Sequence, residues 1–391
     1  MNSQTFTQIR NLTLLLGSSL TVMAGAAISP VLPQIYSAFS NEQSSDLLVK
    51  LTLTLPALFI GLFAPLMGYL LDVWGRKPVL ILALLIYAIA GSSGLYLNSL
   101  EGILVGRALL GIAVAGIMSG FTTLIGDYFQ GQKLARFMGY HGTFMSFGGI
   151  LFLVGGGWLA DFGWRYPFSL YLSALFLFPL LLVFVSEPAF KQSSAGAHKV
   201  AGLPIKKMSL IYLLAFVIMA LVYFIPVHIA FYLNQMEPIS GAKIGVIMAA
   251  LTLASATTSY LFSRYSRILN SHVCFCSSYT LMGVGLLIIS LSGSSSLVLV
   301  GIVLVGLGFG LWVPTINVWL VSGLAPEIRG KVVGGFTTFF FLGQFFSPII
   351  SQPLIQWKGI AASFIAGPVL LFPLAAIYLW LIFSTRRDSI S

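Results

Sequence analysis

Long apolar runs, separated by short polar segments, follow one another along the whole chain. Each run is able to cross the ~30 Å hydrocarbon core of a bilayer as a helix, which takes about 20 residues. Membrane-spanning strands would instead alternate apolar and polar positions over about ten residues, and these runs do not alternate. The pattern therefore predicts an all-α integral membrane protein with 12 spans, near residues 11–35, 47–71, 78–97, 101–126, 135–159, 166–186, 209–233, 242–262, 272–292, 296–322, 331–354 and 360–383.

The composition excludes the other classes of protein. The chain has 391 residues, of which 58% are hydrophobic and 8% are charged, and its mean hydropathy is +0.98. Soluble domains are about 25% charged, so these few charges cannot cover a water-soluble globule, and a chain this apolar is not intrinsically disordered. The 2 cysteines exclude a disulfide scaffold, and no Cys or His cluster has the spacing of zinc ligands. No metal and no cofactor are therefore expected.

The positive residues indicate the orientation, because Lys and Arg concentrate in cytoplasmic loops. With the N-terminus inside, only Lys50, Arg165, Lys243 and Lys358 fall outside, Arg107 lies within a span, and all the others are cytoplasmic. Both termini are thus expected in the cytoplasm, and the net charge of +10 reflects topology rather than nucleic-acid binding. The first run is longer than the core of a signal peptide and is expected to remain as a helix. We expect a multi-pass protein of the cell membrane, here a bacterial inner membrane.

A polar segment at 187–208 divides the chain into two halves, 1–186 and 209–391, and is predicted to be a flexible cytoplasmic linker. Pairs of residues recur at offsets of 195 or 196 positions across this segment: Pro30 with Pro226, Gly111 with Gly306, and Gly139 with Gly334. The repeat predicts two six-helix bundles of the same orientation.

The loop after the second span carries the most specific motif. Residues 68–78 read Gly-Tyr-Leu-Leu-Asp-Val-Trp-Gly-Arg-Lys-Pro, which resembles the signature of the major facilitator superfamily, and the resemblance extends over essentially the whole chain. Members of this superfamily have two parallel halves with a substrate site between them at the bilayer midplane. Within the motif, a small residue at Gly68 favours close helix approach, and Gly75 favours a tight turn.

The resemblance also implies a conformational latch on the cytoplasmic side. In the superfamily the motif's aspartate contacts the eleventh helix and joins a cluster with the arginine and a second acid. The cluster holds the outward-facing state. The residues that match these positions are Gly68, Asp72, Gly75, Arg76, Lys77 and Asp127. The corresponding loop of the second half, 263–267, has serines in place of Asp and Gly, so that copy departs from the pattern.

The fourth span contains Arg107 in a segment that resembles the arginine motif of proton-coupled exporters in the superfamily. An ionisable residue within a span is costly and is functional by default. The alternative is that Arg107 reaches the outer interface and pairs with Glu101. The fifth span departs from the exporter pattern, because the glycines at 148–149 and 155–157 have no proline among them. The segment after it is expected to pair Asp161 with Arg165 in an outer turn.

The remaining polar and aromatic residues of the spans are candidates for the substrate or proton pathway. His228 and Tyr232 are four residues apart and share a helix face, and His228 is either a titrating group or a buried, hydrogen-bonded one. The other candidates are Tyr223, Trp312, Asn317, His141 and Tyr36. No carboxylate is expected in mid-membrane, so protonation would involve His228, Asp127 or the substrate. With Arg107 as the only charge expected there, the substrate is predicted to be neutral or anionic.

These observations together predict a secondary active transporter, namely a monomeric, proton-coupled exporter of a small amphiphilic molecule that works by alternating access in the lipid bilayer. An importer or facilitator of a small metabolite, such as a sugar or organic acid, is the alternative within transport. A membrane receptor or scaffold is the alternative from another class. The chain has no phosphate-binding loop of the ATPase type and no set of catalytic residues with plausible spacing, so an enzyme is not expected.

Overall fold

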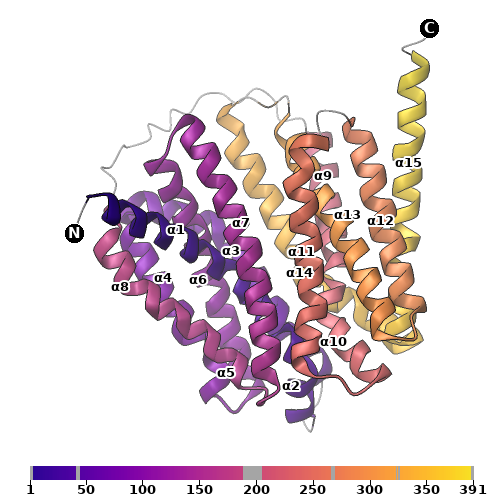
Figure 1. Ribbon diagram of the computed structural model, residues 1–391, viewed down its shortest axis with the longest axis horizontal. Coiled ribbons are helices and arrows are strands. Elements are labelled where there is room, and N and C mark those ends of the chain that lie inside the picture. The colour runs from indigo at the N-terminus through magenta and orange to yellow at the C-terminus, as the bar shows by residue number, and fades with distance from the viewer. Residues whose placement is uncertain are drawn as a thin grey trace.

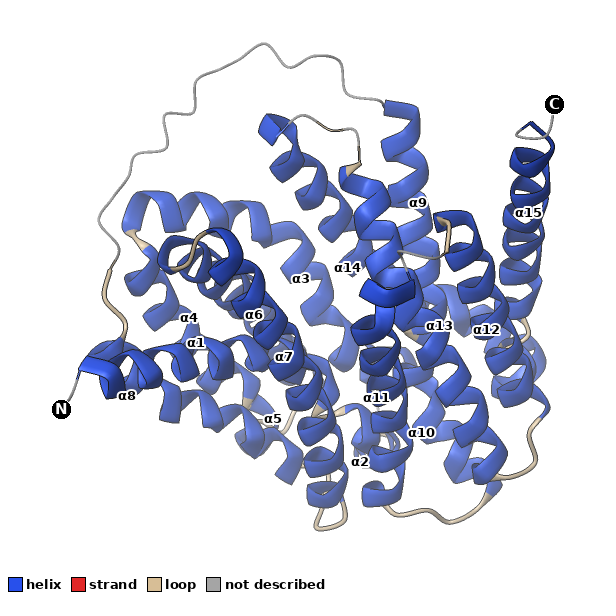
Figure 2. Cartoon of the chain, turned by 45° about the horizontal axis from the view of Figure 1, so that its top comes forward, coloured by secondary structure: helices blue, strands red, loops and turns tan. Residues whose placement is uncertain are grey.

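The computed structural model describes residues 3–40, 45–187, 205–265, 269–322, 324 and 326–388. Throughout these residues the chain forms helices and connecting loops without strands (Figure 2). The elements in chain order are α1 (Ser3–Ala26), η1 (Ser29–Val31), α2 (Leu32–Ala38), α3 (Ser45–Trp74), α4 (Arg76–Gly91), α5 (Ser93–Tyr96), α6 (Leu100–Tyr128), α7 (Gly131–Ala160), η2 (Tyr166–Ser173), α8 (Ala174–Phe184), α9 (Ile205–Val222), α10 (Phe224–Met236), α11 (Gly241–Tyr265), α12 (Ser271–Leu291), α13 (Ser295–Val321), α14 (Pro326–Ser363) and α15 (Ala366–Asp388).

The described helices contain 12 segments long and apolar enough to cross a membrane, as the hydropathy pattern predicts. The first span, Gln4–Ala38, is built from α1, η1 and α2, and it breaks next to Pro30. The seventh span, Lys206–Met236, is built from α9 and α10 and breaks at Tyr223, shortly before Pro226. Proline lacks the N–H that a helix interior needs, so both spans bend where the repeat places a proline.

The buried apolar side chains form two clusters, one for each half. The first cluster extends from Leu14 to Val185 and takes in Val227 from the second half. The second extends from Met208 to Tyr378 and takes in Leu153 from the first half. The predicted segment 187–208 lies mostly outside the described residues.

The repeat is visible in the packing. A Cβ added at Gly111 would lie 2.5 Å from the carbonyl oxygen of Pro56, and one at Gly306 would lie 2.5 Å from that of Leu251. Each half therefore presses its fourth helix onto its second helix at an equivalent glycine.

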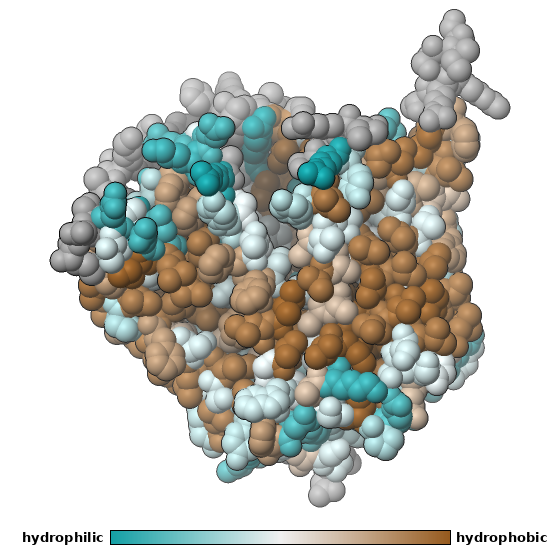
Figure 3. Space-filling view, in the orientation of Figure 1, coloured by the Kyte–Doolittle hydropathy of each residue, from teal (hydrophilic) through white to brown (hydrophobic). Residues whose placement is uncertain are grey.

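The two faces of the molecule differ. We call the face where α3 meets α4 and α6 meets α7 the linker side, because α8 ends there and α9 begins there; it is uppermost in Figure 1. We call the opposite face, where α2 ends and α10 meets α11, the far side. On the linker side, α7 and α11 diverge and a hollow opens between the halves, visible at the top of Figure 3.

The far side is closed by direct packing of one half on the other. A Cβ added at Gly157 of α7 would lie 2.3 Å from the carbonyl oxygen of Gly241 of α11, so only glycine permits this backbone approach. Asp161 at the end of α7 accepts hydrogen bonds from the backbone N–H groups of Gly241 (2.6 Å) and Ala242 (3.2 Å). The start of α11 is thereby held by a carboxylate, which its unpaired N–H groups favour.

The expected pairing of Asp161 with Arg165 is wrong. Arg165 instead donates to the backbone oxygens of Gly94 and Leu97 and to the side chain of Asn98. Asp161 binds N–H groups at the start of α11, and Arg165 binds carbonyl oxygens of a neighbouring loop. The local sequence does not reveal either partner.

Candidate functional site: a central cavity between the halves

A cavity of about 490 Å³ lies between the halves and is lined by residues of both. The first half contributes residues of α1 and α7, and the second half contributes residues of α9, α10, α11, α13 and α14. A second space, of about 880 Å³, lies between the linker-side parts of α7 and α11 and shares Ser146, Thr252 and Phe309 with the first. The central cavity therefore continues into the hollow on the linker side.

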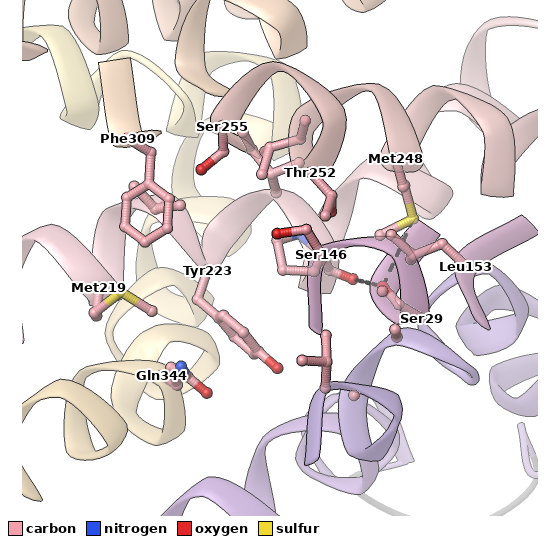
Figure 4. Close-up of a pocket in the computed structure, with 18 of the residues that line it drawn as sticks. Ser29, Ser146, Leu153, Met219, Tyr223, Met248, Thr252, Ser255, Phe309 and Gln344 are labelled. Carbon is pink, nitrogen blue, oxygen red and sulfur yellow. Dashed lines mark hydrogen bonds between the residues drawn. The ribbon is translucent and has the colours of Figure 1, made fainter. Parts of the chain in front are cut away.

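The lining is apolar with scattered neutral polar groups. Among its described residues there is no charged side chain and no histidine. Hydrogen-bonding groups come from Ser29, Ser146, Thr252, Ser255, Ser259, Tyr223 and Gln344. Methionines, phenylalanines and aliphatic residues line the rest, and Figure 4 shows Met219, Met248 and Phe309 among them. Binding sites for small molecules commonly combine an apolar wall with a few polar groups of this kind.

Tyr223 is the predicted pathway residue that lines the cavity. Its side chain projects from the break between α9 and α10 into the space between the halves, with Gln344 nearby (Figure 4). The Tyr223 hydroxyl lies against α1, since a Cβ added at Gly25 would be 2.7 Å from its oxygen.

His228 and Tyr232 lie on one face of α10, but this face is turned into the second half. Nε2 of His228 is hydrogen-bonded to the hydroxyl of Ser351 on α14 (2.8 Å), and Nδ1 is buried without a hydrogen-bond partner. The Tyr232 hydroxyl donates to the carbonyl oxygens of Ile289 and Ser292 at the end of α12. Neither side chain lines the cavity.

The other four aromatic and polar candidates also lie outside the cavity lining. Trp312 is buried and its indole N–H donates to the hydroxyl of Tyr279, 3.3 Å away. Asn317 is exposed and donates to the carbonyl oxygen of Val313 in its own helix. His141 is partly buried on α7, and Tyr36 packs edge-on against Phe231 near the far side.

Arg107 lies one layer behind the cavity wall. Its side chain is fully buried, and Nε donates to the carbonyl oxygen of Thr52 on α3 (2.7 Å). Nη1 donates to the Tyr171 hydroxyl (2.9 Å), and Nη2 donates to the carbonyl oxygen of Ala24 on α1. Arg107 therefore does not reach the outer interface to pair with Glu101. It joins α6 to α1, α3 and η2, and its charge does not face the cavity in this structure.

The residues of the superfamily-like motif come together on the linker side, within the first half. Nε of Arg76 lies 3.1 Å from a carboxylate oxygen of Asp127, and Nη2 lies 3.5 Å from Asp72. Gly75 has a φ of 96° in the turn between α3 and α4, a backbone conformation that favours glycine. Lys77 donates to the carbonyl oxygen of Leu182 at the end of α8.

Two features of this cluster differ from the expectation. Glu187, which the sequence did not single out, accepts hydrogen bonds from the backbone N–H groups of Arg76 and Lys77, both at 2.7 Å, and so caps the start of α4. A Cβ added at Gly68 would meet no atom within 4 Å, so the predicted close helix approach does not occur at Gly68. Gly68 faces open space, and the Asp72 side chain is 71% exposed.

The comparisons with known proteins agree with this geometry. The profile of the Major Facilitator Superfamily matches residues 14–348 and 208–390. The chain belongs to the major facilitator superfamily. It is therefore a transporter that spans the cell membrane many times, acts on small molecules and belongs to a family of transporters rather than of enzymes.

Curated relatives in the superfamily cover nearly the whole chain. The bacillibactin exporter of Bacillus subtilis is 25% identical over 351 residues, which is 85% of this chain and 87% of the relative. The quinolone resistance protein NorA of Staphylococcus aureus is 25% identical over 373 residues, 91% of each chain.

Solved superfamily structures share the fold. A bacterial homologue of the human lysosomal transporter Spinster, in an inward-facing and occupied conformation, has a TM-score of 0.80 at 17% identity and covers 97% of each chain. The inward-open xylose transporter XylE from E. coli has a TM-score of 0.77 at 14% identity and covers 94% of this chain and 95% of its own.

A polar cluster at the far side has no counterpart in the sequence predictions. The sequence places Lys50 on the outer side, and in the structure its side chain is only 3% exposed, near the start of the second span. Its ammonium donates to Asp46 (2.8 Å) and to the side-chain oxygen of Gln352 on α14 (2.9 Å). Arg107 is therefore not the only buried charged side chain among the described residues of the candidate spans. The spacing of Asp46 and Lys50 along one helix is visible in the sequence, whereas nothing there marks Gln352.

Proposed function

We propose that this chain is a proton-coupled exporter that carries small, uncharged amphiphilic molecules from the linker side to the far side. The observation that carries the proposal is the central cavity, which both halves line, which is closed toward the far side and which continues to the linker side. We also propose that the protein works as a monomer of two six-helix halves, 1–186 and 209–391, and catalyses no reaction.

The direction of transport follows from orientation and from the relatives. The positive loops favour a cytoplasmic linker side with both termini inside, so the structure represents an inward-facing state. Two curated relatives carry names of export or drug resistance and match over most of their length. Export is therefore preferred to uptake, although the xylose transporter has the same fold.

The substrate class follows from the lining. A charge transferred into a poorly solvated cavity needs a compensating partner, because its interactions with water are lost. The described lining offers none, and the guanidinium of Arg107 is occupied behind the wall. We therefore narrow the sequence prediction of a neutral or anionic substrate to a neutral one whose hydroxyl, carbonyl or amide groups meet the serines, Thr252, Tyr223 and Gln344.

The linker-side cluster is proposed to act in the opposite state. With the halves apart, Asp72 is exposed and Gly68 faces open space. Closing the linker side would bring α14 onto this face of α3, where Gly68 offers room and Asp72 offers charge.

Transport by membrane vesicles tests the proposal. Inside-out vesicles that contain the protein should accumulate the uncharged dye Nile red when a proton gradient, acid inside, is imposed, and vesicles without the protein should not. Ethidium, a cation, and fluorescein, an anion, are the matched probes of charge. Accumulation that ignores the gradient, or a preference for ethidium, would contradict the proposal, and uptake only in right-side-out vesicles would support an importer. A protein that folds but moves none of a broad panel of neutral compounds would favour the scaffold alternative.

A further inference from the structure

An ion pair of the first half is hydrogen-bonded to the second half at the far side. Lys50 and Asp46 belong to α3 of the first half, and Gln352 belongs to α14 of the second half. The Lys50 ammonium contacts both carboxylate oxygens of Asp46, at 2.7 and 2.8 Å, and donates to the amide oxygen of Gln352. The amide nitrogen of Gln352 donates to the same Asp46 carboxylate. The three side chains therefore form a closed ring of hydrogen bonds across the seam between α3 and α14.

Closing this seam depends on the negative charge of Asp46. Burying an ammonium group away from water costs several kcal/mol unless an opposite charge and hydrogen bonds compensate it. Asp46 provides that charge, while the amide of Gln352 and the ring of Phe231, 5.6 Å away, complete the surroundings of Lys50. When the seam opens, water takes the place of Gln352 beside Lys50. Because water then solvates the ammonium, Lys50 depends less on the negative charge of Asp46.

A proton on Asp46 weakens the ring, because it removes the negative charge that faces the buried ammonium of Lys50. The ionised carboxylate only accepts hydrogen bonds, and here it accepts from Lys50 and from Gln352. The Lys50 and Gln352 hydrogen bonds both end on one carboxylate oxygen, Oδ2, so a proton on Oδ1 leaves that acceptor in place but removes the charge that compensates the buried ammonium. The Asp46 side chain is 40% exposed, so water on the far side has access to it.

We infer that Asp46 is a proton-binding site, and that a proton taken there from the far-side solution releases Gln352 and opens the far side. The inference rests on the proposed function in one respect, namely that the two halves alternate between a far-side-closed and a far-side-open state. The proton is a trigger at the far-side gate, and its passage across the membrane is not part of the inference.

The groups around Asp46 leave this carboxylate as the acid that an external proton reaches. Lys50 lies on its own helix, α10 contributes His228, which is held by Ser351, and α2 contributes Tyr36. The facing residues of α14, Ser351 and Gln352, do not titrate. Asp161 closes the other seam, but it binds backbone N–H groups and compensates no buried cation among the described residues, so its protonation leaves no buried charge without a counter-charge.

Distances between spin labels at the far side test the inference without any need for transport. Labels at Ser37 on α2 and Trp357 on α14, both exposed, report the separation of the halves in bilayer nanodiscs after Cys274 and Cys276 are replaced by alanine. Lowering the pH of the solution from about 7 to about 4 should increase the far-side-open fraction of the native protein.

The variant Asp46→Asn should be open to a greater extent at both pH values and should lose the pH response. Loss of one charge-assisted hydrogen bond corresponds to a change of about tenfold or more in the ratio of closed to open molecules. Gln352→Leu keeps the Asp46–Lys50 pair intact within α3. It should also raise the far-side-open fraction and weaken the pH response. If Asp46→Asn does not fold, the result for Gln352→Leu tests the inference in its place.

The matched control is Glu237→Gln. Glu237 pairs with Lys243 at the far side, 2.9 Å away, but both residues belong to the second half, so the pH response should stay native. Asp161→Asn should likewise keep a pH response. A native protein whose distances ignore pH, or an Asp46→Asn variant that responds as the native protein does, would overturn the inference. The label distances could depend on pH while transport in vesicles does not depend on a proton gradient. That result would support Asp46 as the trigger of far-side opening and would contradict the proposed proton-coupled transport.

Discussion

At the scale of single residues, the interior charges of this transporter are satisfied by groups that hold helices together. Arg107 illustrates this, because its three donors reach the carbonyl oxygens of Thr52 and Ala24 and the hydroxyl of Tyr171. The planar guanidinium presents donors in several fixed directions, which a lysine ammonium at the end of a flexible stem does not reproduce. Arg107 therefore fixes α1, which carries part of the cavity wall, rather than the substrate itself.

Arg107→Lys is expected to destabilise the first half by about 2–4 kcal/mol, because hydrogen bonds to charged groups contribute about 1.5–3 kcal/mol each and at least one would be lost. Thermal unfolding in detergent should show a lower midpoint. Transport should fall to the same extent for neutral and for anionic probes, since the charge does not face the cavity. Arg136→Lys is the control, because Arg136 is exposed and its side chain donates to the hydroxyl of Tyr140. Selective loss of anion transport in Arg107→Lys would place Arg107 at the substrate.

Sequence reasoning identifies such residues but not their partners. Arg107 stands out because a charge within an apolar run is costly, yet two of its partners are carbonyl oxygens, which every residue has. Asp46 and Lys50 form a visible pair, but their third member, Gln352, is 302 positions from Lys50. A rule that depends only on neighbouring residues does not detect a contact made across the two halves.

At the scale of elements, α7 and α11 change from intimate contact to separation along their length. Near the far side, the backbones touch at Gly157 and Gly241, whereas an added Cβ at Gly142 meets no atom within 4 Å. Gly142 lines the space between α7 and α11 that joins the cavity to the linker side. The glycines of α7 thus permit backbone contact near the far side and face open space near the linker side.

If the space at Gly142 is part of the substrate route, then Gly142→Leu should slow transport while leaving the fold intact. A leucine side chain would narrow this passage, and a barrier raised by about 1.4 kcal/mol corresponds to a rate lower by about tenfold. Gly155→Leu is the matched control, since Gly155 lies on the same helix, has open space around its Cα and lies outside the lining. Initial rates of Nile red transport at equal protein content provide the measurement. Equal rates for both variants would remove this space from the route.

The spans themselves could be predicted from the sequence because membrane insertion depends on local hydropathy. All of the predicted runs coincide with described helices. The packing of α7 on α11 could not be predicted, because the chain contains 40 glycines and the sequence does not distinguish those that touch another backbone from those that face open space. The repeat did mark one equivalent pair, Gly111 and Gly306, since duplication preserves packing positions.

At the scale of the whole molecule, one side is closed while the other is open, and the closing contacts include a direct approach between glycine backbones. Gly157→Val should prevent far-side closure, because even a Cβ there would lie 2.3 Å from the carbonyl oxygen of Gly241. The equilibrium should then favour the far-side-open state, and transport should fall below about a tenth of native, since a shift of a few kcal/mol depopulates one state. Spin labels at Ser37 and Trp357 should report a larger separation. Gly155→Val, without a neighbour within 4 Å, should leave that separation unchanged.

Asp72→Asn should shift the molecule in the opposite direction. In this structure Asp72 is exposed and lies 3.5 Å from Arg76, so loss of its charge should cost the linker-side-open state little. In the proposed linker-side-closed state, the same carboxylate would contact α14, and its loss would remove a charge-assisted hydrogen bond, a change of about tenfold in the population ratio. Labels at Val73 on α3 and Val333 on α14, both exposed, should therefore show a larger linker-side-open fraction.

Glu101→Gln, at the start of α6 on the far side, should behave as the native protein does. Combining Asp72→Asn with Gly157→Val should give an intermediate distribution if the two sides are linked through one rigid-body equilibrium, whereas unchanged populations in Asp72→Asn alone would show that this carboxylate does not act as a latch.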